Sequence, residues 1–327
     1  MAGKMVDNLI GEFLERKIAI ALVGPTAIGK TNLSLSLSDV LPVEIVSADS
    51  RQIYKYLDIG TAKPTLEERS RVPHHFIDIC YPDEYYSAGQ YGKDANAVVN
   101  EIFNRGKIPL IVGGSGLYVK ALCEGFFEEG YTSSEKNKAL KIRRELSCWS
   151  RDALYSRLIE VDPETAKLYP DKNYVRLLRA LEFYEVKGVP ISVYRKTFHR
   201  KPDFTTIYIG LIAERKQIYS LIENRVEKMW NDGLVVEVKN ILDMGYSPEL
   251  NSLNTVGYKE TIDFLQGRID ANTAIELIKQ NTRRYAKRQI TWFKKNNQIR
   301  WFDAFKDNLL KNILDFLNQK IESFVTN

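Results

Sequence analysis

One short segment constrains the fold of this chain more than any other: residues 24–31 read Gly-Pro-Thr-Ala-Ile-Gly-Lys-Thr. Its two glycines are separated by four residues and are followed by lysine and threonine, which is the spacing of a phosphate-binding loop. An apolar run at Ile18–Val23 precedes the segment, and a helix-compatible stretch at Asn32–Leu41 follows it. Because strand, loop and helix occur in the order that the motif requires, we predict an α/β fold with a P-loop NTPase-like parallel sheet core flanked by helices.

The residue types of this loop predict an anion site. Gly24 and Gly29 allow the backbone N–H groups to turn inward, and the following helix adds the positive end of its dipole. Lys30 supplies a charge for the outer phosphates, and the Thr31 hydroxyl can bind a magnesium ion that bridges them. The diphosphate or nucleotide is therefore expected on Gly24, Pro25, Thr26, Ala27, Ile28, Gly29, Lys30 and Thr31. The motif alone does not specify the reaction.

Length and composition limit the remaining possibilities. A chain of 327 residues exceeds the usual size of one compact domain, so we expect a main domain with a sizeable insertion. The longest apolar runs are too short to span a bilayer, and residues 1–16 lack the apolar core of a signal peptide. Cys80, Cys123 and Cys148 have no metal-ligand spacing, which is typical of reduced thiols. We therefore expect a cytoplasmic protein without a membrane partner.

Two further strands are predicted to end beside the loop. The apolar run at residues 44–48 ends in Asp49 and Ser50, and the run at 108–112 ends in Gly113-Gly114-Ser115-Gly116. Ligands of open parallel sheets bind beyond the carboxyl ends of the strands. A carboxylate at this place can hold a metal shell or act as a general base, although a helix cap is the alternative role for Asp49. The glycines around Ser115 are expected to admit a ligand close to the backbone.

The middle of the chain reads as an all-helical insertion. Strand signals disappear there, and helical periodicity predicts helices at 134–149, 151–160 and 173–187. The expected domains are a P-loop catalytic core with C-terminal RNA-binding helices at 1–125 and 202–327, and a helical insertion domain at 126–201. Arg176 and Arg179 lie one helical turn apart, where they can meet phosphates or form a solvated face.

A strand at Thr206–Ile212 resumes the predicted sheet, and the helix after it carries Arg215 and Arg225. Arg225 is a candidate clamp for charge that develops on a phosphate, with a structural salt bridge as the alternative.

The C-terminal part of the chain is strongly basic. Residues 277–302 contain eight Lys or Arg and no Asp or Glu. Tyr285, Gln289 and Trp292 form a stripe beside these charges at helical spacing. A surface of one sign with interleaved aromatic residues is typical of nucleic-acid binding, and a merely solvated face is the alternative.

Together these motifs resemble those of the tRNA dimethylallyltransferase family, which isopentenylates adenine 37 of tRNA. The matching segments are residues 24–31, 49–54, 58–64, 73–78, 113–118, 175–182, 256–258 and 286–292. They occur in order from about residue 18 to residue 302, so the resemblance is far more specific than the loop alone.

The resemblance implies transfer of a dimethylallyl group from dimethylallyl diphosphate to N6 of adenosine 37 in tRNA, with Mg²⁺ as cofactor. The loop would hold the diphosphate leaving group, although such proteins are often described as ATP-binding. Asp49 would accept the N6 proton, Thr31 would place the diphosphate and the metal, and Arg225 would steady the departing charge, with Arg215 left open as an alternative. The insertion would grip the anticodon arm, and the protein would be a monomer. The tRNA-facing residues would be Asp49, Ser50, Arg51, Gln52, Ser115, Asn173, Tyr174, Val175, Arg176, Leu177, Gly257, Tyr258, Lys287, Arg288 and Gln289.

Two departures from the family pattern are small. Ile28 replaces a small loop residue, and Ser115 replaces a threonine but keeps its hydroxyl. Two other functions use the same loop: a P-loop small-molecule kinase, which does not explain the basic stretch, and a nucleotide-switched RNA-binding protein, which leaves Asp49 without a task.

Overall fold

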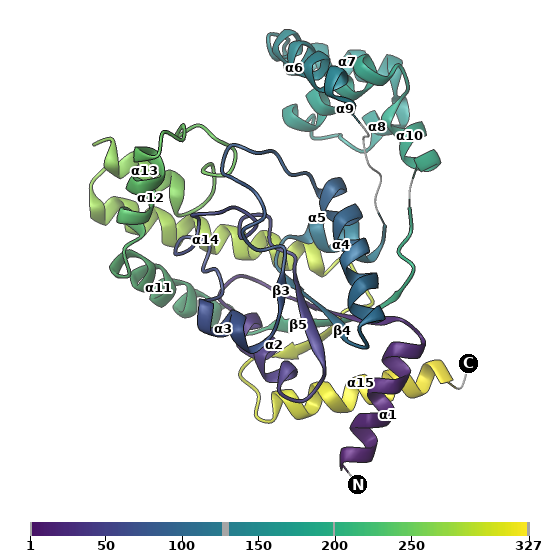
Figure 1. The fold of residues 1–327 in the computed structure, drawn as a ribbon. Helices are drawn as coiled ribbons and strands as arrows, with labels where there is room; N and C mark the ends of the chain where they lie inside the picture. Colours follow the sequence, from purple (N-terminus) through teal and green to yellow (C-terminus); the bar gives the residue numbers. More distant parts are fainter. Residues whose placement is uncertain (1, 126–130, 199, 326–327) are drawn as a thin grey trace. The chain divides into compact units, whose positions relative to one another are not determined.

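A computed structural model of the chain describes residues 2–125, 131–198 and 200–325 (Figure 1). The chain divides into two compact units, Met1–Glu124 with Pro202–Asn327 and Gly125–Lys201. These limits differ by one residue from the expected ones, although residue 126, the predicted start of the insertion, lies outside the described residues. The first unit contains a parallel sheet with helices and the second is helical, so the predicted fold class is confirmed.

The sheet of the first unit has six strands in the order β3-β2-β4-β1-β5-β6, and all neighbours are parallel. The strands are β1 (Ile18–Val23), β2 (Val43–Ser47), β3 (His74–His75), β4 (Ile108–Gly113), β5 (Thr205–Ile212) and β6 (Arg300–Asp303). Every residue of β1 is buried, because helices cover both faces of a parallel sheet and leave no solvated side. The continuous apolar run at 18–23 is the sequence signal of this central position.

The helices of the first unit pack around this sheet. They are α1 (Ala2–Glu15), α2 (Lys30–Ser38), α3 (Leu66–Arg71), α4 (Ala88–Asn104), α5 (Gly116–Cys123), α11 (Arg215–Asn231), α12 (Leu234–Asp243), α13 (Tyr258–Leu265), α14 (Ala271–Phe293) and α15 (Leu309–Val325). Helix α4 begins at Ala88, where the Ser87 side chain caps it by accepting a hydrogen bond from the Gln90 N–H at 3.0 Å. Throughout the described ranges, no helix combines the length and the apolar character that a bilayer crossing needs.

Helix α1 and strand β6 were not predicted from the sequence. Helices α1 and α15 lie side by side (Figure 1), where the Arg16 guanidinium donates a hydrogen bond to the Phe324 carbonyl at 3.2 Å. Strand β6 begins at Arg300, so the basic stretch is divided between α14, a connection and an edge strand. Four residues of mixed polarity carry little strand signal, and pairing with β5 supplies what the local sequence lacks.

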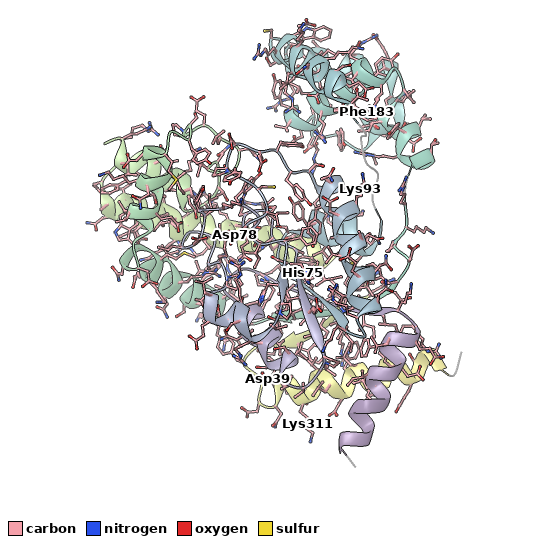
Figure 2. The ribbon with its side chains drawn as sticks, viewed as in Figure 1. Asp39, His75, Asp78, Lys93, Phe183 and Lys311 are labelled. Carbon is pink, nitrogen blue, oxygen red and sulfur yellow. The ribbon has the colours of Figure 1, made fainter. Side chains whose placement is uncertain are left out.

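The second unit has its own apolar core. Its helices are α6 (Ser133–Ser147), α7 (Arg151–Val161), α8 (Pro163–Lys167), α9 (Tyr174–Lys187) and α10 (Ile191–Phe198). Phe183 lies fully buried in this unit (Figure 2) and contacts the Tyr194 ring edge-on, with centroids 4.9 Å apart. Helix α9 ends at Lys187, as predicted, and is followed by Gly188, whose φ of 68° favours glycine.

Candidate functional site

Residues that follow the carboxyl ends of β1, β2 and β4 line a cavity of about 930 Å³. A second cavity of about 420 Å³ adjoins it and extends along α13 and α14. The side chains that line both cavities are Thr26, Asp49, Thr61, Arg225, Met229 and Tyr285. The sheet edge predicted from the strand pattern therefore holds one site with two lobes.

The phosphate loop forms one wall of the larger lobe. Gly29 precedes α2 with φ of 94°, and a Cβ at Gly24 would lie 2.7 Å from the Leu211 carbonyl oxygen. Only glycine avoids strain and collision at these two places. The first turn of α2, which contains Lys30 and Thr31, thereby opens its free N–H groups toward the cavity.

Two buried cations lie at this wall. The Lys30 ammonium donates to the carbonyl oxygens of Gly24 at 3.0 Å and Pro25 at 2.7 Å, and Arg225 Nη1 donates to Thr26 Oγ1 at 3.2 Å. Burial and the neighbouring Arg225 lower the pKa of Lys30 to about 7, and burial also lowers the pKa of Arg225. Within the described part of the chain, neither cation has a carboxylate at ion-pair distance. The wall is therefore suited to an anionic ligand.

The two candidate arginines of α11 lie in different surroundings. Arg225 lines both lobes, whereas Arg215 is exposed at the start of the helix and donates to the Tyr219 hydroxyl at 2.9 Å. The structure thus brings Arg225, and not Arg215, to the phosphate loop.

Asp49 lies opposite the cations at the end of β2. Its Oδ1 accepts hydrogen bonds from the backbone N–H groups of Arg51 at 2.9 Å and Gln52 at 3.4 Å. Among the described residues, no hydrogen bond involves the other carboxylate oxygen. Asp49 therefore closes a turn with one oxygen and presents the second to the cavity. The two predicted roles, cap and base, are thus compatible with each other.

Other residues that were predicted to face tRNA hold the loops next to Asp49. The Ser115 hydroxyl accepts from the Ser50 N–H at 3.0 Å and donates to Ser50 Oγ at 3.2 Å. Arg51 Nη1 donates to the Asn251 carbonyl at 2.7 Å, and Gln52 Nε2 donates to the Thr61 carbonyl at 3.2 Å. These side chains connect the ends of β2 and β4 to the surrounding loops.

The glycines around Ser115 serve protein packing, and two of them, Gly113 and Gly114, also line the larger lobe, so the expected approach of a ligand stays a prediction. A Cβ at Gly113 would lie 2.1 Å from the Ala48 carbonyl oxygen, and one at Gly116 would lie 2.2 Å from the Trp292 ring. At Gly114 a Cβ would lie 2.1 Å from Gln289 Nε2. The backbone of β4 is therefore approached closely by other parts of the same chain.

Gln289 departs from its predicted place on the RNA-facing surface. It is buried, its Oε1 accepts from the Thr26 N–H at 2.8 Å, and its Nε2 donates to the Gly114 carbonyl at 3.0 Å. It therefore braces the phosphate loop from α14. Two other predicted tRNA contacts, Leu177 and Tyr258, are fully buried, and Gly257 is buried as the residue before α13.

The basic residues of α14 fall into two groups. Lys279 pairs with Glu227 at 3.0 Å and Arg283 pairs with Glu223 at 2.9 Å, so both are neutralised by α11. The second group, Arg284, Lys287 and Arg288, is exposed. The spacing alone did not separate the groups, because Glu223 and Glu227 come from a distant part of the sequence; Lys279 also pairs with Glu276 on α14 at 2.9 Å.

Tyr285 lines the cavity, whereas the sequence predicted only that it belongs to an aromatic stripe on a helix. Burial, followed by the Asp49 charge, raises the pKa of Tyr285 to about 12, so its hydroxyl stays protonated at neutral pH. Its position four residues before Gln289 on α14 is the signal that would have found it, because both line the larger lobe.

In the helical unit, Asn173 Oδ1 caps α9 by accepting from the Arg176 N–H at 3.2 Å. Val175 and Arg176 are exposed, and the Tyr174 hydroxyl donates to the Ser147 carbonyl at 2.9 Å. The exposed pair is available to a partner, whereas the residues beside it support the helix.

The protein alone offers few ligands for a metal ion. Within the described ranges there is no group of three or more His, Cys, Asp or Glu that could hold one. The Thr31 hydroxyl and the Asp49 carboxylate line the larger lobe. Mg²⁺ commonly takes one or two protein ligands and completes its shell with water and substrate phosphates, so this sparse donor set fits a magnesium–diphosphate complex.

Comparisons with known proteins show relatives of this chain over most of its length. The family model described as IPP transferase matches residues 52–296. A protein named tRNA dimethylallyltransferase from Thermotoga petrophila is 47% identical over 292 residues, which are 89% of this chain and 94% of the relative. A relative with the same name from Caldanaerobacter subterraneus is 42% identical and covers 93% of this chain and 98% of its own.

Solved structures give the same result. The tRNA isopentenylpyrophosphate transferase of Bacillus halodurans is 36% identical with a TM-score of 0.69, over 94% of this chain and 97% of that one. A eukaryotic dimethylallyltransferase acting on tRNA is 27% identical with a TM-score of 0.78, over 94% of this chain and 80% of that one.

Proposed function

The chain belongs to the IPP transferase family, and from this membership we propose that it transfers a dimethylallyl group from dimethylallyl diphosphate to N6 of adenosine 37 in tRNA. The products are N6-dimethylallyladenosine and diphosphate. The kinase and the nucleotide-switched regulator, which share the loop, have no support from the relatives.

The observation that carries the proposal is the meeting of two lobes at Asp49, Thr26 and Arg225. One lobe contains the phosphate loop and its two buried cations, and the other is lined by Arg288 and Lys259. A diphosphate in the first lobe and a nucleoside in the second would bring their reacting atoms to the same carboxylate. Turning the adenosine out of its stack costs a few kcal/mol, which phosphate contacts elsewhere offset.

In the proposed reaction, the allylic C–O bond breaks and the diphosphate leaves with the electron pair. Loop N–H groups, Lys30 and Arg225 stabilise its growing charge. The N6 lone pair forms the new C–N bond, and the N6 proton passes to Asp49 Oδ2. The amides of Arg51 and Gln52 hold the other oxygen, so the carboxylate is already oriented for this transfer.

We propose that Mg²⁺ binds with the diphosphate through the Thr31 hydroxyl, the first-turn residue of α2. The ion would neutralise charge on the leaving group. We also propose that the protein acts as a monomer in the cytoplasm. The free cysteines Cys80, Cys123 and Cys148 suit a reducing compartment.

The test combines purified protein, magnesium, labelled dimethylallyl diphosphate and an unmodified tRNA that carries adenosine 37. We expect label in the RNA, and we expect Asp49→Ala to reduce the transfer rate by about 10²–10⁴ because the general base is lost. tRNA affinity, measured by filter binding, should stay within a few-fold. The matched control is Asp39→Ala, which removes a surface carboxylate that pairs with Arg71.

Other results would redirect the assignment. ATP turnover without RNA labelling would support the kinase, and RNA binding without either reaction would support the regulator. Near-normal transfer by Asp49→Ala would show that another group accepts the proton.

A further inference from the structure

We infer that Glu237 is a positioning residue of this active site, although it lies on α12 outside both lobes; the inference rests on the proposed function. The Glu237 carboxylate accepts hydrogen bonds from three consecutive backbone N–H groups. The donors are those of Asp58 at 3.0 Å, Ile59 at 2.6 Å and Gly60 at 3.1 Å. One side chain on a distant helix therefore fixes the start of the loop at residues 58–63, which we name the wall loop.

Tyr258 completes this contact. Its hydroxyl donates to Glu237 Oε1 at 2.6 Å, and burial together with the Glu237 charge raises its pKa well above the usual range, so the proton stays in place. Its ring packs so closely on Gly60 that a Cβ there would lie 2.4 Å from the ring. Each Glu237 oxygen thus receives two hydrogen bonds, and α12 and α13 hold the wall loop from one side.

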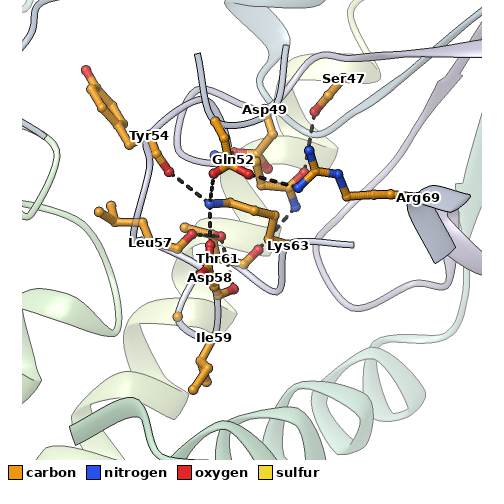
Figure 3. Close-up of polar contacts among 12 residues, drawn as sticks. Ser47, Asp49, Gln52, Tyr54, Leu57, Asp58, Ile59, Thr61, Lys63 and Arg69 are labelled. Carbon is orange, nitrogen blue, oxygen red and sulfur yellow. Dashed lines mark hydrogen bonds and ion pairs between the residues drawn. The ribbon is translucent and has the colours of Figure 1, made fainter. Parts of the chain in front are cut away.

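Lys63 holds the other end of the wall loop (Figure 3). Its buried ammonium donates to the Tyr54 carbonyl at 2.9 Å and to Asp78 at 2.5 Å, and it also pairs with Asp58. Charged groups of the protein itself therefore fix the wall loop at both ends.

The wall loop connects this clamp to the reacting carboxylate. Its Thr61 lines both lobes, and the carbonyls of Thr61 and Ala62 each accept a hydrogen bond from Gln52 Nε2 at 3.2 Å (Figure 3). The Gln52 backbone N–H is in turn one of the two donors to Asp49 Oδ1. A shift of the loop therefore displaces both the junction of the lobes and the base. Among the described residues, no hydrogen bond or ion pair joins Glu237 to Lys30 or Arg225.

This separation predicts a specific kinetic signature. Glu237→Gln keeps the shape but places an NH₂ group against donors, because each carboxylate oxygen accepts two hydrogen bonds. We expect kcat for tRNA prenylation to fall about 100-fold, the loss typical of a small misplacement. Tyr258→Phe removes one donor and should lower kcat by about tenfold or less. The Kd for magnesium pyrophosphate, measured by calorimetry, should stay within about twofold in both variants.

Two more variants strengthen the test. Gly60→Ala pushes the wall loop off the Tyr258 ring while the Glu237 side chain keeps its carboxylate, and it should show the same loss of kcat with unchanged pyrophosphate affinity. Asp243→Asn, at the exposed end of the same helix, is the control and should behave as wild type.

The inference is overturned if Glu237→Gln keeps wild-type kcat. It is also overturned if kcat, pyrophosphate affinity and thermal stability fall together, because that pattern indicates a general role in folding. A wild-type protein that labels no tRNA overturns the proposed function itself, so the two failures are distinguishable.

Discussion

Two lysines that line the same cavity have opposite surroundings. The Lys63 side chain is only 4% exposed and pairs with Asp58 and Asp78. The Lys30 side chain is buried in the phosphate loop, where its ammonium meets carbonyl oxygens and, among the described residues, no carboxylate at ion-pair distance. A buried ammonium is costly unless a counter-ion accompanies it. Lys63 has its counter-ions within the fold, whereas Lys30 lacks one until an anion binds.

The contrast shows that burial alone does not identify a binding cation. Lys63 stabilises the wall loop, and removing it exposes two carboxylates to each other. The charged form of Lys30 is stabilised only when an anion binds. In the ligand-free protein its pKa is therefore lowered to about 7. Five experiments test this comparison between paired and unpaired cations.

The largest effect is expected for Lys30→Met. Loss of one preorganised cation at the leaving group should lower kcat/KM for dimethylallyl diphosphate by about 10²–10³. The melting temperature of the ligand-free protein should not fall, because an unpaired buried charge has been removed. Steady-state kinetics and thermal denaturation check the two parts. Transfer within tenfold of wild type would contradict the assigned role.

Lys63→Met should show the reverse pattern. It leaves Asp58 and Asp78 without their shared cation, but these carboxylates are 61% and 31% exposed and can be hydrated. We therefore expect a loss of about 1–3 kcal/mol in the free energy of unfolding, less than for a fully buried pair. Urea denaturation measures this loss. Pyrophosphate affinity should change only a few-fold, and a loss as large as that of Lys30→Met would remove the distinction.

The third experiment follows the Lys30 proton. At pH 8 the lysine is mostly neutral without ligand, because its pKa is about 7, and an anion should restore its charge. Binding of dimethylallyl diphosphate without tRNA should then take up close to one proton at pH 8 and progressively less toward pH 6. Calorimetry in buffers of different ionisation enthalpy measures the uptake, and Lys30→Met should lack it.

The same shift has a consequence for stability. Between about pH 7 and the ordinary lysine value near 10.4, the unfolded chain binds more protons than the native protein at this residue. The Lys30 contribution to stability therefore rises with pH across this range. A bound diphosphate should reduce that rise, and an equal slope with and without ligand would contradict it.

The smallest effects concern α14, where paired and unpaired cations occur on one helix. Arg284→Ala with Arg288→Ala should flatten the salt dependence of tRNA binding by about one phosphate per arginine. Lys279→Ala with Arg283→Ala removes residues that pair with α11, so it should change stability more than the salt slope. Filter binding at several salt concentrations separates the pairs, and equal slopes would mean that the ion pairs open when RNA binds.

Local patterns predicted much of this molecule from the sequence. The strands at 18–23, 108–112 and 206–212 and the phosphate loop could be found because apolar runs and glycine spacing are properties of neighbouring residues. The position of Asp49 beside the loop followed from the rule that parallel strands end at one edge. Periodicity predicted α6, α7 and α9 of the second unit, whereas the short helices α8 and α10 were not predicted.

The contacts that could not be predicted join residues far apart in the chain. Gln289 was placed on a surface because its spacing matches exposed neighbours, yet Thr26 and Gly114 draw it inside. Glu237 carried no motif, because its role exists only when the backbone at Asp58–Gly60 folds against it. Local propensity contains no information on such tertiary partners.

The brace from Gln289 to Thr26 also bears on how the protein is made. The phosphate loop leaves the ribosome early in translation. Strand β5, which pairs with β1, begins only at Thr205, and Gln289 is synthesised later still. During translation the loop is present long before the residue that secures it. A chain cut short before residue 289 carries the loop motif but lacks the Gln289 hydrogen bonds to Thr26 and Gly114.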